Sequence, residues 1–451
     1  MQPRALKITV PASKNAMETI EAYFERKHEE LRLLNSCLRS PLNLTHPESV
    51  TEVVRYKFQL TAALRAEHAL RDWTGTETAW SERPHAAGPF EFKYDYQRAD
   101  LAVSGPSFYG KEGEFAQETT YTGSGMAAIS ALLLASARVT KEADLLILQG
   151  SYGETLEFVE GYARHLRLIP LGQSLEETNG RAYSSRILLL DSCAPGGALE
   201  GTLRCSNAAL DLLIFDTTCF SGGSGRIRRV LNWARKWGVP VVMVRSHTKL
   251  DSLGAEYGRL GSATFIHWEE NDPWITGSKF KDLPAETQNA IRLLGGAALP
   301  AHFPPYIGTS NYRALTKKRV AIILRNNRRA VEYFSSALPG LTVEHFAHGL
   351  YVKLGTTQFL DEDTARQAAA DMSSDLSRAG IPIRHAGSFG FDFAAVEWCQ
   401  SSATHGYSVR LSVSDLPTRF WDDLIRAVAE WWNADRRSGV NPHRLPSTKS
   451  T

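Results

Sequence analysis

Strand-like and helix-like segments alternate along the middle of this 451-residue chain, and this alternation limits the possible fold more than any other feature. Short apolar runs rich in β-branched residues are separated by segments whose apolar residues recur at helical spacing. Such alternation is typical of a mostly parallel sheet with helices on both faces. The predicted strands are 144–149, 166–171, 186–191, 210–216, 239–245 and 262–268, and the predicted helices between them are 126–139, 154–165 and 227–237.

Both ends of the chain differ from this central part. Residues 16–38 and 50–73 predict two amphipathic helices, the second capped by Ser49 with Glu52 completing a capping box. Beyond about residue 300 the pattern becomes that of an α+β domain, with helices expected at 312–338, 364–379 and 418–433 and strands at 341–346, 350–354 and 408–413. The predicted division is an N-terminal helical arm (1–88), a large α/β domain (89–300), a small α+β domain (301–434) and a disordered tail (435–451). The arm could pack on its own subunit or embrace a partner subunit.

Composition excludes several classes of function. A net charge of +2 gives no reason to expect nucleic acid or an anionic membrane as a partner. No apolar run approaches the roughly 20 residues of a membrane span, and the charged N-terminus does not resemble a signal peptide. The five cysteines are scattered without metal-ligand spacing, so we expect a reducing cytoplasm and no metal site.

A lysine follows the apolar run 239–244, in the sequence Arg245-Ser246-His247-Thr248-Lys249. An amine at the end of a buried strand is held at a fixed point and partly desolvated, which makes it a nucleophile toward an aldehyde. The neighbouring hydroxyls of Ser246 and Thr248 could hold a phosphate. This arrangement is what a Schiff-base enzyme needs, although a solvated loop lysine would have the same sequence signature.

Two features upstream of Lys249 add to this interpretation. Thr122-Gly123-Ser124-Gly125-Met126 stands directly before a helix, where backbone N–H groups and the helix dipole favour a phosphate. A buried helix with a tight entry turn is the alternative. At the end of the next strand, Tyr152 could stack on a cofactor ring.

Two charged residues lie on apolar strands. Asp216 ends a wholly apolar strand, where a carboxylate is costly unless a cation such as a protonated pyridine nitrogen pairs with it. It could instead cap the following turn. Arg410 stands among apolar residues and suits capture of a carboxylate, or forms an ordinary buried ion pair.

The order of these features resembles that of the fold-type I enzymes dependent on pyridoxal 5′-phosphate (PLP), and specifically the cystathionine synthase and lyase group of cysteine and methionine metabolism. The resemblance covers roughly residues 94–431. It is carried by Ser124-Gly125-Met126-Ala127-Ala128, Ser151-Tyr152-Gly153, Asp216, Ser246-x-Thr248-Lys249, Ser388-Phe389-Gly390, Arg410-Leu411-Ser412-Val413 and Tyr96-Gln97-Arg98.

The resemblance implies a role for each of these residues. Lys249 would hold the cofactor and act as the catalytic base, Asp216 would pair with the ring nitrogen, and Tyr152 would stack on the ring and assist proton transfer. Ser124, Gly125, Met126, Ser246 and Thr248 would bind the phosphate, and Arg410 and Ser388 would contact the substrate. Tyr96 and Arg98 would reach the phosphate in a neighbouring subunit, so that a homodimer or homotetramer shares its active sites.

The sequence also departs from the pattern of this group. Ala99-Asp100-Leu101 replaces the expected Asn-Pro-Thr, and the segment from Leu250 to Glu256 lacks the group's Tyr and Gly-His-Ser-Asp. One branch that this chain resembles in these departures forms terminal alkynes, converting a chlorinated allylglycine to propargylglycine with loss of HCl.

The expected activity is therefore that of a PLP-dependent lyase catalysing γ-elimination or γ-replacement on a γ-substituted α-amino acid, with the alkyne-forming reaction as a specific case. A lyase or synthase acting on cystathionine or methionine is one alternative, and an aminotransferase on the same fold is another. A regulator or scaffold that has lost its chemistry is a non-enzymatic alternative.

Overall fold

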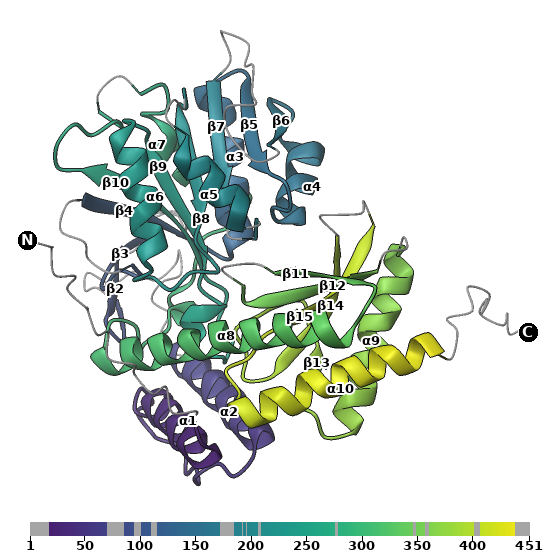
Figure 1. Ribbon diagram of the computed structural model, residues 1–451. Coiled ribbons are helices and arrows are strands. Elements are labelled where there is room, and N and C mark those ends of the chain that lie inside the picture. Colours follow the sequence, from purple (N-terminus) through teal and green to yellow (C-terminus); the bar gives the residue numbers. More distant parts are fainter. Residues whose placement is uncertain are drawn as a thin grey trace, which may run out of the picture.

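The computed structural model describes residues 18–69, 85–93, 101–109, 115–171, 185–191, 193–194, 196–205, 209–275, 278–345, 349–356, 360–400 and 406–437. Its elements form a large sheet covered by helices, a smaller sheet with helices on one side, and a pair of N-terminal helices at the end of the molecule away from the large sheet (Figure 1). No helix within these ranges combines the length and the apolar character that crossing a membrane would require.

The large sheet has seven strands in the order β4-β10-β9-β8-β7-β5-β6. The five strands from β9 to β6 are parallel, whereas β10 runs antiparallel to both of its neighbours. The strands are β4 (Phe115–Thr122), β5 (Ala143–Leu148), β6 (Leu166–Leu171), β7 (Ser185–Leu190), β8 (Leu212–Asp216), β9 (Val241–Ser246) and β10 (Gly261–Trp268). Every residue of β5 and β8 is buried, as both faces of this sheet are covered.

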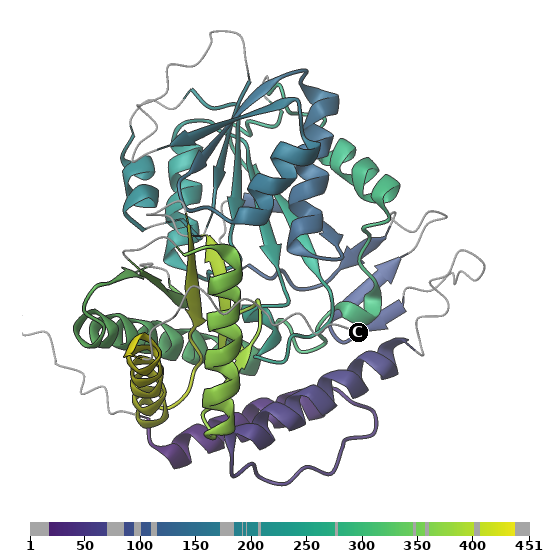
Figure 2. The same ribbon diagram turned by 90° about the vertical axis from the view of Figure 1, so that its right-hand side faces the viewer.

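Helices cover both faces of this sheet (Figure 2) and pack on it through two apolar layers. On one face α3 (Gly125–Val139), α4 (Gly153–Tyr162) and α7 (Leu283–Leu294) lie with a core that includes Leu132, Leu145 and Val244. On the other face α5 (Gly196–Arg204) and α6 (Gly225–Lys236) pack over Leu146, Phe215 and other residues of the same strands. Because successive side chains of a strand point to opposite faces, each strand contributes to both layers.

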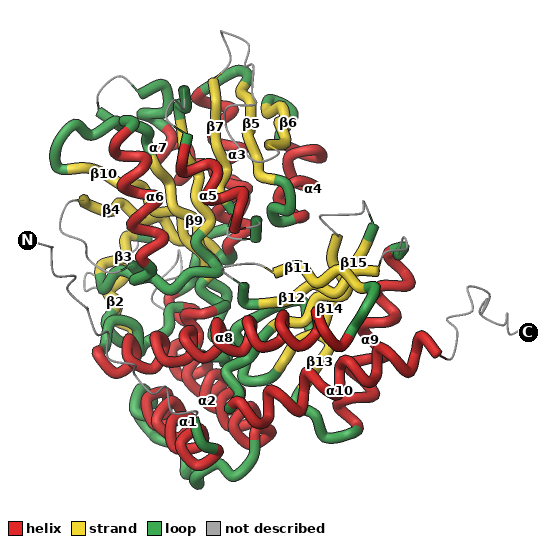
Figure 3. Tube along the Cα trace, in the orientation of Figure 1, coloured by secondary structure: helices red, strands yellow, loops and turns green. Residues whose placement is uncertain are grey.

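The smaller sheet has the order β11-β12-β15-β14-β13. Its strands are β11 (Leu341–His345), β12 (Tyr351–Thr356), β13 (Ile383–His385), β14 (Ala394–Gln400) and β15 (Tyr407–Ser412). The long helix α8 (Ser310–Ala337) and the helices α9 (Glu362–Arg378) and α10 (Thr418–Arg437) accompany it (Figure 3). Leu354, Leu411 and Trp421 lie in the core that these elements enclose.

The N-terminal arm consists of α1 (Ile20–Asn35) and α2 (Val50–Ala69), which lie beside the first turns of α8 (Figure 1). Their leucines pack in one core with Phe90 and Phe92 of β2 (Phe90–Lys93) and with Leu253 and Tyr257. A small sheet of β2 with β1 (His85–Ala87) and β3 (Ala102–Ser104) adjoins this core. The described part of the arm therefore packs on its own chain.

The predicted fold class is confirmed: a mostly parallel large sheet, a smaller α+β part and N-terminal helices are all present. The Ser49 side chain caps α2 by accepting from the Glu52 N–H at 3.2 Å, while the Glu52 carboxylate accepts from the Glu48 N–H rather than from Ser49. Some boundaries were wrong: α4 ends at Tyr162 because residues 163–165 turn into β6, and α10 continues past its predicted end at residue 433 to Arg437. The helices and strands missed in the sequence are β1, β2, β3, β4, α5, α7, β13 and β14.

One glycine allows β10 to lie against the start of α3. Gly261 begins β10, opposite Thr122 of β4 on one side and Ser246 of β9 on the other. A Cβ atom at Gly261 would stand 2.2 Å from the carbonyl carbon and oxygen of Ser124. The backbone of the turn before α3 can therefore lie this close to β10 only because Gly261 has no side chain.

We predict that Gly261→Ala lowers the free energy of unfolding by roughly 1–3 kcal/mol or more, because the backbone of the turn must move to admit the new methyl group. Gly296→Ala is the matched control, since its Cβ would meet only the Ala127 Cβ at 3.9 Å. We expect the control to stay within about 0.5 kcal/mol of the wild type. Chemical denaturation measures both, and equal stability of the two variants would contradict the prediction.

Candidate active site

A cavity of about 270 Å³ lies at the carboxyl ends of β8 and β9, between the large sheet and the loops of the smaller one. The residues that line it carry hydroxyls, two carboxylates, an amine, two guanidinium groups and two thiols. The lining residues are Ser124, Gly125, Met126, Ile129, Tyr152, Glu154, Cys193, Asp216, Thr218, Cys219, Val244, Arg245, Ser246, Thr248, Lys249, Gly387, Phe389 and Arg410.

The first turn of α3 forms one wall. The Ser124 hydroxyl caps the helix by accepting from the Ala127 N–H at 3.0 Å, and the Thr122 hydroxyl donates to the Ser124 carbonyl at 2.7 Å. Gly125 lies so close to Ser246 that a Cβ would stand 3.0 Å from the Ser246 Cβ. The free N–H groups at a helix start attract anions. Gly125 and Met126 of this helix start line the cavity together with Ser124.

The end of β9 supplies two hydroxyls to the same wall. Ser246 and Thr248 hydrogen-bond to each other through their side chains at 2.9 Å. His247, between them in sequence, points to the other side and lies buried between Asp251 and Ser262, at 2.8 and 2.9 Å. This alternation is that of an extended segment, whose successive side chains point to opposite sides.

Lys249 follows these hydroxyls and is largely buried. Its Nζ donates to the Ser388 hydroxyl at 2.5 Å and lies 5.4 Å from the centre of the Phe389 ring. Burial lowers the pKa of the Lys249 amine, an effect that the nearby Glu256 opposes and Arg410 reinforces. Lower basicity increases the fraction of neutral amine, which is the nucleophilic form.

Asp216 ends β8 and is 8% exposed. One of its oxygens accepts from the Thr218 N–H at 2.8 Å, the turn-capping contact considered from the sequence. Burial, with a further contribution from the nearby Asp191 carboxylate, raises the pKa of Asp216 to about 7. The negative charge of Asp216 is therefore poorly compensated within the chain, and a cation in the cavity would favour its ionised form.

Tyr152 is placed by a second buried carboxylate. Its backbone N–H donates to Asp191 at 2.7 Å, and the Cys193 N–H donates to the other oxygen of Asp191 at 2.6 Å. Burial raises the pKa of Tyr152, and a hydrogen bond with Glu154 raises it further, so the phenol stays protonated at neutral pH. The side chain therefore offers the cavity a flat ring and a proton donor rather than a base.

Arg410 combines both of the alternatives considered from the sequence. It lines the cavity, and it also forms an ion pair with Glu397 of the adjacent strand β14 while its guanidinium lies 4.9 Å from the Tyr351 ring centre. Among the described residues its Nε is buried without a hydrogen-bond partner. The guanidinium thus retains a donor for a further anionic group.

The structure brings most of the predicted site residues together. Nine of them line the cavity: Ser124, Gly125, Met126, Tyr152, Asp216, Ser246, Thr248, Lys249 and Arg410. The tenth, Ser388, accepts from Lys249. Tyr96 and Arg98 lie outside the described residues.

Other residues around the cavity were missed in the sequence analysis, and the chief ones are Asp191, Thr218 and Glu154. Thr218 accepts from the Ser246 N–H at 3.0 Å and so joins the ends of β8 and β9. Asp191 follows the apolar strand β7 directly, the same signal that drew attention to Asp216 on β8. Glu154 gave no signal, because an acid in the first turn of a helix is common.

No family model matches the sequence, and no curated protein sequence matches it either. Among solved structures, cystathionine gamma synthase from Xanthomonas oryzae pv. oryzae in complex with cystathionine is similar over 70% of this chain and 82% of its own, with 16% identity and a TM-score of 0.48. MetB from Corynebacterium glutamicum is similar over 70% of this chain and 80% of its own, with 16% identity and a TM-score of 0.46. At such identities the activity has to be inferred from the site itself.

We predict that Asp216→Asn stabilises the protein freed of any bound cofactor, and increasingly so as pH rises. The folded state holds a proton on Asp216 up to about pH 7, whereas the unfolded chain releases it near its ordinary pKa of about 4. The stabilisation by this proton is complete below about pH 4 and is lost as pH rises through 7. Since each pKa unit corresponds to about 1.4 kcal/mol, the melting temperature of the variant should exceed that of the wild type at pH 8 and approach it toward pH 5.

Asp251→Asn serves as a control of opposite sign. Burial disfavours the ionised form of Asp251, but the paired Arg245 guanidinium outweighs burial and holds the pKa of Asp251 well below its usual range. Its charge therefore stabilises the fold at neutral pH, and its removal should lower the melting temperature at pH 8. A pH-independent difference between wild type and Asp216→Asn would rule out the raised pKa.

Proposed function

We propose that this cavity binds pyridoxal 5′-phosphate and that the protein is a PLP-dependent enzyme. The observation that carries the proposal is the pairing, in one cavity, of a desolvated lysine with a poorly compensated buried carboxylate at the ends of adjacent strands. A helix start and two hydroxyls lie against the same cavity and suit a phosphate. This donor set fits a ligand that carries an aldehyde, a basic ring nitrogen and a phosphate.

Each group of the ligand has a residue suited to it. Ser124, Gly125 and Met126 of α3, with Ser246 and Thr248, would hold the phosphate. Asp216 would pair with the ring nitrogen, Tyr152 would lie against the ring, and Lys249 would hold the aldehyde. Tyr96 and Arg98 would add phosphate contacts from a neighbouring subunit of a homodimer or homotetramer.

The reaction that these residues support is γ-elimination or γ-replacement on an α-amino acid. When bound, the cofactor supplies an electron-accepting ring that stabilises negative charge at Cα. Arg410 would fix the substrate α-carboxylate through its remaining donor, and Ser388 would hold the Lys249 amine. Lys249 would then remove a proton from Cα, give that proton up, and remove a second one from Cβ, which allows a group on Cγ to leave with its bonding electron pair.

Within this reaction class we propose loss of HCl from a chlorinated allylglycine, giving propargylglycine. The support is the segment after Lys249, where the motifs of the thioether enzymes are absent. In their place Asp251 is committed to Arg245 and His247 inside the protein. Elimination of chloride needs no recognition of a thiol, which agrees with the absence of these motifs.

We predict that the purified protein mixed with pyridoxal 5′-phosphate absorbs visible light and gains a pyridoxyl group on Lys249 after borohydride reduction, located by peptide mass spectrometry. Lys249→Ala should lose the covalent attachment, because the amine is gone. Lys353→Ala is a control for incidental labelling, since Lys353 is also a buried lysine on the smaller sheet but does not line the cavity. Labelling spread evenly over surface lysines would overturn the cofactor assignment.

A second prediction separates the possible reactions. With chloroallylglycine the holoenzyme should release chloride and form propargylglycine, and Lys249→Ala should lower the rate by at least about 10³-fold, because it lacks the base. Ion chromatography and mass spectrometry measure the two products. Turnover of cystathionine or methionine without chloride release from chloroallylglycine would instead assign the protein to sulfur amino-acid metabolism. Formation of pyridoxamine phosphate from the amino acid, followed by transfer of the amino group to an added keto acid, would make it an aminotransferase.

A further inference from the structure

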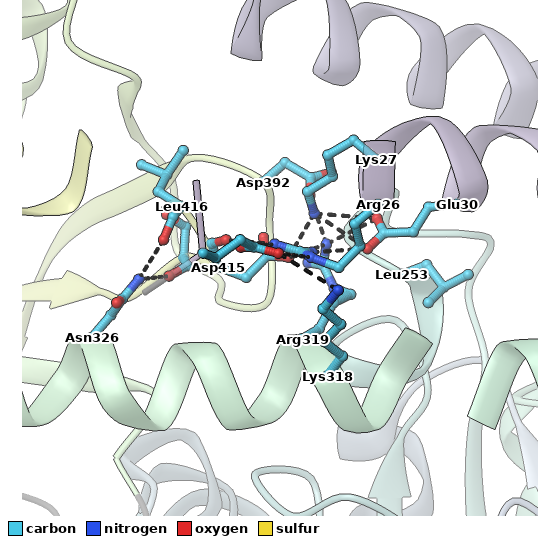
Figure 4. Close-up of polar contacts among 12 residues, drawn as sticks. Arg26, Lys27, Glu30, Leu253, Lys318, Arg319, Asn326, Asp392, Asp415 and Leu416 are labelled. Carbon is cyan, nitrogen blue, oxygen red and sulfur yellow. Dashed lines mark hydrogen bonds and ion pairs between the residues drawn. The ribbon is translucent and has the colours of Figure 1, made fainter. Parts of the chain in front are cut away.

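A buried cluster of charged side chains joins the N-terminal arm to the rest of the molecule (Figure 4). The arm contributes Arg26, Lys27, Glu30 and Lys57, and the remaining members are Arg319 of α8 and the loop residues Asp392 and Asp415. Each of these seven residues is at most 3% exposed. With Glu18, which pairs with Arg26, the cluster holds four cations and four carboxylates and is neutral as a whole.

Stability alone is a poor explanation for such a cluster. Removing charges from water is costly, and packed apolar side chains of similar volume usually stabilise a fold as well as or better than buried ion pairs. Ion pairs instead constrain geometry, because each donor and acceptor fixes the position of its partner. The cluster fixes two backbone segments near Lys249.

The first segment is the turn that follows Lys249. Lys57 Nζ donates to the carbonyl oxygen of Leu253 at 2.5 Å. Leu253 has a φ of 52°, in the left-handed region that a leucine rarely adopts. Such a conformation persists only when its surroundings impose it, and the Lys57 ammonium supplies one of the constraints.

The second segment is the loop that carries Ser388, the partner of the Lys249 amine. Arg319 donates to the Gly390 carbonyl at 2.9 Å and to Asp392 at 2.6 Å, and Lys57 pairs with the other oxygen of Asp392 at 2.8 Å. Gly390, with a φ of 88°, lies against the backbone of Lys249, where a Cβ would stand 3.3 Å from the Lys249 carbonyl. Lys57 thus contacts both the turn after Lys249, through a hydrogen bond, and the loop that carries Ser388, through an ion pair.

We propose that Lys57 is a positioning residue: through it the N-terminal arm aligns the Lys249 amine with Ser388. Asp251 anchors the start of the turn to β9 through Arg245, and Lys57 anchors its end at Leu253. Both anchors lie within four residues of Lys249, whose amine is hydrogen-bonded to Ser388. The inference rests on the proposed function only in taking Lys249 as the amine that receives the cofactor.

The test compares Lys57→Met with Arg26→Met. Arg26 belongs to the same cluster and is equally buried, but its contacts are with Glu18, Glu30 and Asp415. We expect Lys57→Met to slow borohydride-trapped attachment of pyridoxal phosphate to Lys249 by about tenfold or more, because small misplacements of a reacting group cost large factors in rate. Arg26→Met should attach cofactor at close to the wild-type rate. The visible circular dichroism of the bound cofactor should change in Lys57→Met alone.

A charge-balanced variant separates positioning from folding. Lys57→Met with Glu30→Gln removes one cation and one carboxylate, which restores neutrality but not the hydrogen bond to Leu253. All variants are measured at a temperature at which far-UV circular dichroism shows them folded. We expect attachment to remain slow in this double variant.

The outcomes distinguish the two ideas. If wild type fails to attach the cofactor at Lys249, the proposed function is wrong. If wild type attaches it and Lys57→Met does so at the same rate, or if Arg26→Met is slowed equally, the positioning role is wrong. Recovery of the wild-type rate in the double variant would also overturn it, because the loss would then reflect only charge imbalance. Slow attachment in both Lys57 variants, with Arg26→Met unaffected, supports it.

Discussion

The ion pair between Arg245 and Asp251 is the interaction on which the candidate site depends. The guanidinium donates to both oxygens of Asp251, at 2.7 and 2.8 Å, and to the carbonyls of Thr217 and Phe220. It thereby ties the turn containing Lys249 to the segment that follows Asp216. With His247 as a further partner of Asp251, the whole arrangement is buried, so breaking one side would leave a charge uncompensated at a cost of about 3–5 kcal/mol.

Sheet topology then gathers around this pair residues that are far apart in sequence. Parallel strands end at the same edge of a sheet, so Asp216 and Ser246 become neighbours there although a helix separates them in the chain. The antiparallel strand β10 brings the turn before α3 to the same edge, above Gly261. The smaller sheet adds Arg410 and the loop of Ser388 from the other side. A cavity lined from two sheets results.

The sequence revealed those parts of the site whose signal is local. A polar residue at the end of an apolar strand is conspicuous, which is why Asp216, Lys249 and the turn at Ser124 were found. The cluster around Lys57 was not, since charged residues on an amphipathic helix look like a solvated face, and their partners stand hundreds of residues away: Arg26 pairs with Asp415 across 389 positions. Helix α5 was missed because Gly196, Gly197 and Gly201 make its sequence resemble a loop.

The molecule contains two kinds of buried charge, and their difference separates binding from positioning. In the arm cluster every cation has carboxylate partners within the chain, so the charges fix geometry and offer nothing to a ligand. At the end of β8 the negative charge of Asp216 is incompletely compensated, and burial raises the pKa of Asp216 to about 7. A ligand carrying a protonated ring nitrogen would supply the missing positive charge and lower that pKa. Of these two groups of buried charge, the unbalanced one lies where a ligand is expected to balance it.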